Sequence, residues 1–258
     1  MNTEIVFTKD MKFRNAVLFT GLPGIGLVGK IAVDYMLKQL KAAKVADIYS
    51  DTFPPSVQSK KGILEPITDQ LYYYSHKDND YLFLAGPVQP SLDMRMGAPE
   101  EHYEFASKII DALKARGLKR IYTLAGLNVG ERRMSAIPKI IVAATSKKDL
   151  EEWTAAGAKV DKPEGLITGA AGLILGVGHR QGLEGACLMG ETNAKLIYGD
   201  HGAAKEMLSL LIKKFGFKID MSSIEKEAKE IEKAFKELSK QFEEEPEEMP
   251  KTGLSYVR

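Results

Sequence analysis

The chain has 258 residues, of which 44% are hydrophobic and 28% are charged, and its formal net charge at pH 7 is +1. This composition is typical of a globular protein with a full core, and the near-zero charge predicts no general attraction to nucleic acid or to anionic membranes. Cys187 is the single cysteine, which excludes an intramolecular disulfide and a cysteine-cluster metal site. No apolar run approaches the ~18 residues of a membrane span, and residues 1–14 lack the apolar centre of a signal peptide. We therefore expect a cytoplasmic protein.

The first predicted element is a buried strand over residues 15–20, followed by a glycine-rich turn and a helix from Val28 to Leu40. Within this turn, Gly24, Gly26 and Gly29 fit G-x-G-x-x-G, the pattern of a dinucleotide-binding turn. The pattern also has the expected context, because it follows a strand and opens a helix. The question is whether the turn binds a nucleotide or only joins the strand to the helix.

A nucleotide-binding role for this turn lacks two of the residues that it needs. Two of the glycines and Lys30 fit most of the triphosphate pattern G-x-x-x-x-G-K, but the apolar Ile31 replaces the hydroxyl residue that would hold Mg²⁺. The dinucleotide pattern requires an acidic residue at the end of the second strand, ~20 residues on. Asp47 lies inside that strand, and Asp51 comes a few residues too late. We therefore expect the glycines to permit a tight turn and a close approach of the helix to the sheet.

Up to residue 220, the rest of the chain alternates short apolar runs with amphipathic helices. The pattern predicts strands over 43–50, 71–75, 81–86, 120–126, 139–146 and around 186–189, with a hairpin turn at 76–80. It predicts helices over 99–116, 147–156 and 201–215, and a further glycine-rich helix after residue 165. This alternation indicates an α/β fold, in which a mostly parallel sheet is flanked by helices on both faces.

Beyond residue 220 the composition changes to Lys and Glu, with a heptad pattern of apolar residues. Their spacing alternates between four and three, as in the seam of a coiled coil, and they are Ile224, Ala228, Ile231, Phe235, Leu238 and Phe242. The last segment is acidic and broken by prolines, and alone it should be disordered. We therefore expect an α/β domain over 1–220, a C-terminal helical extension over 221–245 and a flexible acidic tail over 246–258.

Three segments together resemble the archaeal homologues of proteasome assembly chaperones. They are GLPGIGLVGKIAVDYML from Gly21, GLITGAAGLILGVGHRQGLEGACLMGET from Gly165 and YGDHGAAKEMLSLLIKKFG from Tyr198, in the order expected for that family. The resemblance implies a fold similar to that of purine nucleoside phosphorylases, no enzymatic activity, and a role as a chaperone or adaptor for proteasome subunits. It also implies that the glycine turn belongs to the fold and is not a phosphate site.

Candidate chemical groups elsewhere in the chain form no recognisable motif. His179 and Arg180 follow the glycine-rich helix, and Asp200 and His201 precede the next helix, so these four could converge on a pocket at the strand ends. Asp200 is equally explained as a helix cap. We expect His76 to be solvated in its hairpin turn, and Arg132 and Arg133 to form a solvated charged pair. No spacing matches an acid-base or metal motif, so we expect no catalytic residue, no metal and no cofactor.

Two hypotheses from different classes therefore stay open. The first is a non-enzymatic adaptor of the proteasome assembly chaperone type, which binds proteasome subunits or a second chaperone of the same family and forms a homo-oligomer. The second is an enzyme or sensor that binds a nucleotide or nucleoside at the strand ends. The second hypothesis requires one set of residues to converge on a single concave pocket, namely Gly24, Gly26, Lys30, Asp47, His179 and Asp200.

The adaptor hypothesis places its binding residues at the C-terminus. Proteasome activators in general dock through a terminal hydrophobic residue, then tyrosine, then any residue, whereas here the tyrosine is third from the end. The candidate partner-binding residues are Leu254, Tyr256, Val257 and Arg258. A second candidate surface, for oligomerisation or for a partner helix, is the later part of the heptad seam, namely Ile231, Phe235, Leu238 and Phe242.

Overall fold

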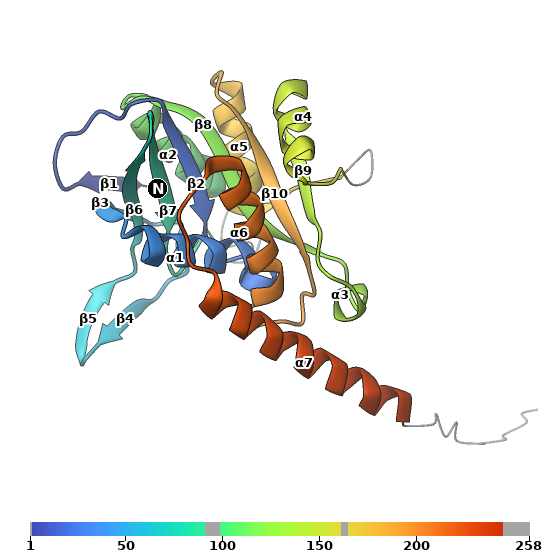
Figure 1. The fold of residues 1–258 in the computed structure, drawn as a ribbon. Helices are drawn as coiled ribbons and strands as arrows, with labels where there is room; N and C mark the ends of the chain where they lie inside the picture. Colours follow the sequence, from blue (N-terminus) through green and yellow to red (C-terminus); the bar gives the residue numbers. More distant parts are fainter. Residues whose placement is uncertain (1, 91–98, 161–164, 245–258) are drawn as a thin grey trace, which may run out of the picture.

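The structure, a computed structural model, describes residues 2–90, 99–160 and 165–244 (Figure 1). Its centre is an eight-stranded sheet in the order β1-β3-β6-β7-β2-β8-β10-β9. The strands are β1 (Thr3–Phe7), β2 (Ala16–Gly21), β3 (Ala43–Ser50), β6 (Asp69–His76), β7 (Asn79–Ala85), β8 (Leu118–Asn128), β9 (Ile140–Ala144) and β10 (Glu184–Thr192). A separate hairpin, made of β4 (Val57–Lys60) and β5 (Ile63–Pro66), projects from the body.

The parallel pairings occupy the middle of the sheet, where β2 lies between β7 and β8 and β8 pairs with β10. Antiparallel pairings add β6, β3 and β1 on one side and β9 on the other. The prediction of a sheet flanked by helices is confirmed, and the predicted hairpin turn joins β6 to β7. The next strand after the glycine turn and its helix is β3. It is not a neighbour of β2 in the sheet, because β6 and β7 lie between them.

Helices cover both faces of this sheet, and each face has its own apolar core. The helices of the described chain are α1 (Val28–Leu40), α2 (Pro99–Lys114), α3 (Arg132–Ser135), α4 (Lys147–Ala156), α5 (Gly169–Arg180), α6 (His201–Phe215) and α7 (Ser222–Glu244). A short 3-10 turn, η1 (Ile25–Leu27), precedes α1. Buried residues of α1, α4 and α6 share one cluster with one face of the sheet, whereas those of α2 and α5 share the other. None of the helices within the described ranges has the length and apolar character needed to cross a bilayer.

An aromatic cluster fills the first of these cores, in the part of the fold where α6 ends. Phe19 of β2 contacts the rings of Tyr81, Tyr122 and Phe215 at centroid separations of 5.3 to 6.2 Å. His76 stacks on Tyr74 at the end of β6, and its Nε2 is buried without a described hydrogen-bond partner. The prediction of a solvated His76 was therefore wrong, because its half-buried ring also packs near Tyr81 and Phe217.

The C-terminal helix α7 begins against the body and then leaves it (Figure 1). Ile224 and Ala228, the first two residues of the heptad seam, are buried, and Ile224 belongs to the same core as α6. Ile231 is half-buried. The side chains of Phe235, Leu238 and Phe242 lie outside the part of the chain whose side chains are described.

Candidate functional site

A cavity of about 290 Å³ opens at the carboxyl ends of β2, β8 and β10, and we call it the strand-end cavity. The glycine turn forms one wall, the N-terminus of α5 forms another, and Leu124 and Met189 line it from the sheet. Its polar groups come from Thr and amide side chains, and none of the described residues that line it carries a charge. Such a lining can hold an uncharged or apolar group, but it offers no side-chain cation to a phosphate.

The glycine turn serves packing at two of its three pattern positions. A Cβ on Gly29 would overlap the carbonyl oxygen of Leu124, so this glycine lets α1 lie directly on β8. Gly26 has φ = 60°, a left-handed conformation that favours glycine, and a Cβ there would collide with Thr192. Gly24 has extended dihedrals and open space around it. The interpretation of the turn as a structural joint is consistent with this geometry.

The six residues that the nucleotide hypothesis needs do not converge. Of them, only Gly24 lines the strand-end cavity. Lys30 pairs with Asp34 on the outer surface of α1, and the two charged atoms are 2.8 Å apart. Asp47 pairs with Lys44 on β3. His179 is exposed at the end of α5.

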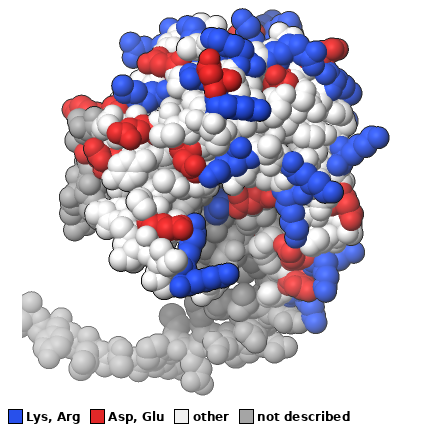
Figure 2. Space-filling view, turned by 90° about the vertical axis from the view of Figure 1, so that its left-hand side faces the viewer, with Lys and Arg blue, Asp and Glu red and all other residues white. Residues whose placement is uncertain are grey.

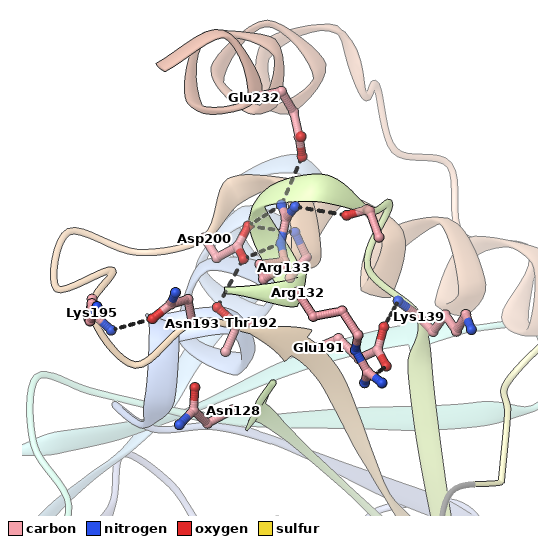
Figure 3. A network of polar contacts seen from close by, with 12 residues as sticks. Asn128, Arg132, Arg133, Lys139, Glu191, Thr192, Asn193, Lys195, Asp200 and Glu232 are labelled. Atoms are coloured by element: carbon pink, nitrogen blue, oxygen red, sulfur yellow. Dashed lines mark hydrogen bonds and ion pairs between the residues drawn. The ribbon is translucent and has the colours of Figure 1, made fainter. Parts of the chain in front are cut away.

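Asp200 is instead the centre of a buried ion pair (Figure 3). It caps α6 through a hydrogen bond from the backbone N–H of Ala203 to its Oδ1, as the cap interpretation predicted. Arg133 donates from Nε to Asp200 Oδ2 at 2.7 Å and from Nη2 to Oδ1 at 2.8 Å. The hydroxyl of Thr192, the last residue of β10, donates to the same carboxylate. The Arg133 and Asp200 side chains are both 0% exposed.

The prediction of a solvated pair is therefore wrong for Arg133. Burial alone would lower the pKa of Arg133, but the hydrogen bonds to Asp200 and Glu232 outweigh it and raise that pKa. The guanidinium therefore stays charged, and its planar fork matches both oxygens of Asp200. Arg132 fits the prediction better, since its side chain is 64% exposed and pairs with Glu191.

The third member of the buried network comes from α7. Arg133 Nη2 also donates to Glu232 Oε1 at 2.8 Å, and Glu232 points from α7 toward the body in Figure 3. Five residues earlier on α7, Glu227 Oε2 lies 3.2 Å from His201 Nε2, which ties the start of α6 to the same helix. We call Arg133, Asp200 and Glu232 the α7 anchor. It fixes the direction in which α7 leaves the body, and the C-terminal residues follow directly after α7.

No pattern in the sequence points to the α7 anchor. Arg133 lies 67 positions before Asp200 and 99 positions before Glu232, so no local spacing connects them. The predicted partner residues Leu254, Tyr256, Val257 and Arg258 lie outside the described residues. Cys187 is buried in β10, and burial raises the pKa of its thiol to about 11, as expected for an inert cysteine.

Among solved structures, this chain is similar to Pyrococcus furiosus PbaB, described as an archaeal proteasome activator. The two chains are 32% identical with a TM-score of 0.81, over 92% of this chain and 98% of PbaB. Pyrococcus furiosus PbaA, described as an archaeal homolog of proteasome-assembly chaperone, is 27% identical with a TM-score of 0.71, over 94% and 93% of the two chains. The Mycobacterium tuberculosis chaperone homologue Rv2125 shares the fold, with a TM-score of 0.67 at 14% identity, over 90% of this chain and 97% of its own.

The sequence comparisons agree with this fold. The Methanocaldococcus jannaschii protein MJ1210 is 34% identical over 223 residues, which are 86% of this chain and 82% of the relative. The pattern of the PAC2 family matches residues 18–239, which include the glycine turn, the α7 anchor and most of α7. The chain is therefore a member of the PAC2 family.

Proposed function

We propose that this protein is an adaptor of the proteasome assembly chaperone type, which binds partner protein subunits and performs no chemistry itself. The observation that supports it most is the similarity to PbaB, which extends over nearly the whole of both chains. Membership of the PAC2 family and the similarity to PbaA point in the same direction. A proteasome partner would place the protein in the cytoplasm.

In this proposal each part of the chain has its own task. Residues 1–220 form the body, residues 221–245 form an extension, and residues 246–258 carry the binding segment. The α7 anchor supports this assignment of roles, because it holds the first half of α7 at a defined angle to the sheet. The tail would then start from a fixed point and present Leu254, Tyr256, Val257 and Arg258 to a partner. Tyrosine combines a large rigid contact surface with a polar tip, which suits an anchor residue.

Oligomerisation would strengthen such a tail. We propose that Ile231, Phe235, Leu238 and Phe242 pack against a second copy or a partner helix, because an exposed apolar stripe on a helix is unfavourable in water. Several tails on one body would raise the effective concentration of each tail at a partner that has several subunits. The double variant Phe235→Glu/Leu238→Glu should then lower the oligomer mass in light scattering. The matched control Lys226→Gln/Lys240→Gln, which makes the same change of net charge outside the seam, should leave that mass unchanged.

Capture from a lysate of the native cell tests the function itself. The full chain should enrich proteasome subunits or a second PAC2 protein, and a chain that lacks Leu254 to Arg258 should not. Equal enrichment by both chains would show that the body recruits the partner. Enrichment of neither class by the full chain would contradict the proposed function.

The strand-end cavity is the one observation that favours the second hypothesis. Because its described lining is uncharged, it fits an uncharged nucleoside better than a nucleotide. Calorimetry with adenosine tests this fit, and the adaptor proposal expects no heat of binding. Saturable heat that is lost in Asn128→Leu, a change in the cavity wall, would favour a nucleoside-binding enzyme or sensor.

A further inference from the structure

A second pocket lies at the opposite edge of the sheet, where the parallel strands begin. It has a volume of about 500 Å³, and we call it the amino-edge pocket. The charged and amide side chains that line it are those of Asn15, Lys77, Asn79, Lys119, Arg120, Glu152 and Lys214. The amino ends of β2, β7 and β8 lie at the top of Figure 1, whereas α7 lies at the bottom. The pocket is therefore separate from the strand-end cavity and from the α7 anchor.

The lining of the amino-edge pocket carries more positive than negative charge. Figure 2, which keeps the vertical direction of Figure 1, shows Lys and Arg side chains along the upper part of the surface, with Asp and Glu side chains among them. The described residues that line the pocket include four cations and a single carboxylate, Glu152. A positive excess remains even when Asp149 and Glu184, which contact Arg120 at 2.6 and 3.5 Å, are added to the balance.

Two of these cations are held in position by carboxylates. Arg120 Nη1 donates to the buried Asp149, and Lys214 Nζ lies 3.1 Å from Glu152 Oε2. These contacts leave further N–H groups on both side chains, since a guanidinium has five donors and an ammonium three. Arg120 and Lys214 can therefore donate hydrogen bonds to a ligand from side chains whose conformations are already fixed by the carboxylates.

The other two cations have no carboxylate partner in the part of the chain that the structure describes. Lys77 and Lys119 are exposed, and neither forms an ion pair with any carboxylate among the described residues. The Lys77 ammonium reaches across to the end of α6, because a Cβ placed on Gly216 would lie 3.1 Å from its Nζ. Lys77 lies in the turn between β6 and β7, Lys119 in β8 and Lys214 in α6, so their charges approach the pocket from different directions.

The pocket has a rigid aromatic floor. Tyr81 and Tyr122 are buried, and Tyr122 lies against Trp153 with ring centroids 5.0 Å apart. Burial raises the pKa of Tyr122, so its hydroxyl keeps its proton at neutral pH and can donate it in a hydrogen bond. Lys214 Nζ lies 4.8 Å above the Trp153 ring. Trp153 is the single tryptophan of the chain, and it therefore reports on changes at this floor.

We propose that the amino-edge pocket binds a polyphosphate group, either free or attached to a nucleoside. A chain of phosphates has oxygens that point in several directions, so it can contact cations from three segments of the fold at the same time. A ligand with a single carboxylate has fewer oxygens and would contact fewer of these cations. The pocket volume is in the range of ~300–1,000 Å³ that is usual for small-molecule sites. This inference is independent of the proposed adaptor function, because it uses none of the same residues.

Trp153 fluorescence provides the test on the full chain, with calorimetry as the second measurement. Inorganic tripolyphosphate should change the emission in a saturable way, and added salt should weaken the binding because the contacts are ionic. ATP should bind at least as tightly as tripolyphosphate, and AMP should bind more than tenfold more weakly. An affinity for ATP well above that for tripolyphosphate would identify the nucleoside-linked form as the ligand. Equal affinities would identify the phosphate chain alone.

Two charge variants complete the test. Lys77→Gln/Lys119→Gln removes the two ammonium groups that have no ion pair within the described ranges, and it should weaken tripolyphosphate binding at least tenfold. The control Lys38→Gln/Lys226→Gln removes two exposed lysines outside the pocket and should leave the affinity unchanged. A flat titration in both measurements, equal binding of AMP and ATP, or the same loss of affinity in both variants would overturn the proposal.

Discussion

Replacing Arg133 by leucine should destabilise the protein more than any other single change in the α7 anchor. The change removes the charge that balances Asp200, whose side chain is 0% exposed. Asp200 would keep its hydrogen bonds from Thr192 and from the backbone N–H of Ala203, but its negative charge would be buried without a counter-charge. Breaking a buried ion pair on one side typically costs ~3–5 kcal/mol, and we expect a loss in that range.

The matched change on α7, Glu232→Gln, should cost far less. Glu232 is 39% exposed, and Arg133 would keep both bonds to Asp200. We expect a loss of roughly 0.5–1.5 kcal/mol, the usual net value of one hydrogen bond. Asp200→Asn in the Arg133→Leu background should recover part of the stability, because asparagine removes the buried charge and still caps α6.

Urea denaturation of the full chain, followed by circular dichroism, gives these free energies of unfolding. Hydrogen exchange adds a local measurement, since the amides of α7 should exchange faster in both Arg133→Leu and Glu232→Gln. A loss below ~1 kcal/mol for Arg133→Leu would refute the reasoning, because it would mean that no buried charge is left unbalanced. Unchanged exchange in α7 would show that the network does not hold this helix.

Three further predictions concern the body of the protein. Gly29→Ala should cost ~1–3 kcal/mol in urea denaturation, because the new Cβ overlaps the Leu124 carbonyl, whereas Gly24→Ala, which meets open space, should be neutral. Burial raises the pKa of Asp69 well above the ordinary 3.8, so the folded state binds this proton more tightly than the unfolded chain. The free energy of unfolding should therefore fall as pH rises from 3.8 toward the raised pKa, and Asp69→Asn should abolish this fall and raise the melting temperature at pH 7. Cys187 should resist iodoacetamide in the native protein and react in urea; rapid native labelling would contradict its burial.

The parts of the fold that depend on local signals could be predicted from the sequence. The helix from Lys147 to Ala156 is an example, because Ser146 caps its start and Gly157, with φ = 126°, ends it. The glycine turn is another, since a strand, a tight turn and a close helix require glycine at defined positions. Such signals lie within a few residues of the element that they define.

The order of the strands and the α7 anchor could not be predicted in this way. β3 follows the first helix in the chain, but two later strands separate it from β2 in the sheet. Arg133 and its neighbour Arg132 have the same residue type and nearly the same local sequence, yet one is buried and the other exposed. Only the tertiary fold distinguishes them, because the partners of Arg133 come from distant segments.

A binding isotherm with the proteasome core particle of the same cell tests the central claim most directly. Four forms are compared, namely the full chain, the chain without Leu254 to Arg258, Tyr256→Ala and Ser255→Ala. The adaptor account predicts that truncation abolishes binding, that Tyr256→Ala weakens it by ~2 kcal/mol, or roughly 30-fold, and that Ser255→Ala leaves it unchanged. Equal affinities for all four forms would contradict the role of the tail, and no binding by the full chain would contradict the assignment of the proteasome as its partner.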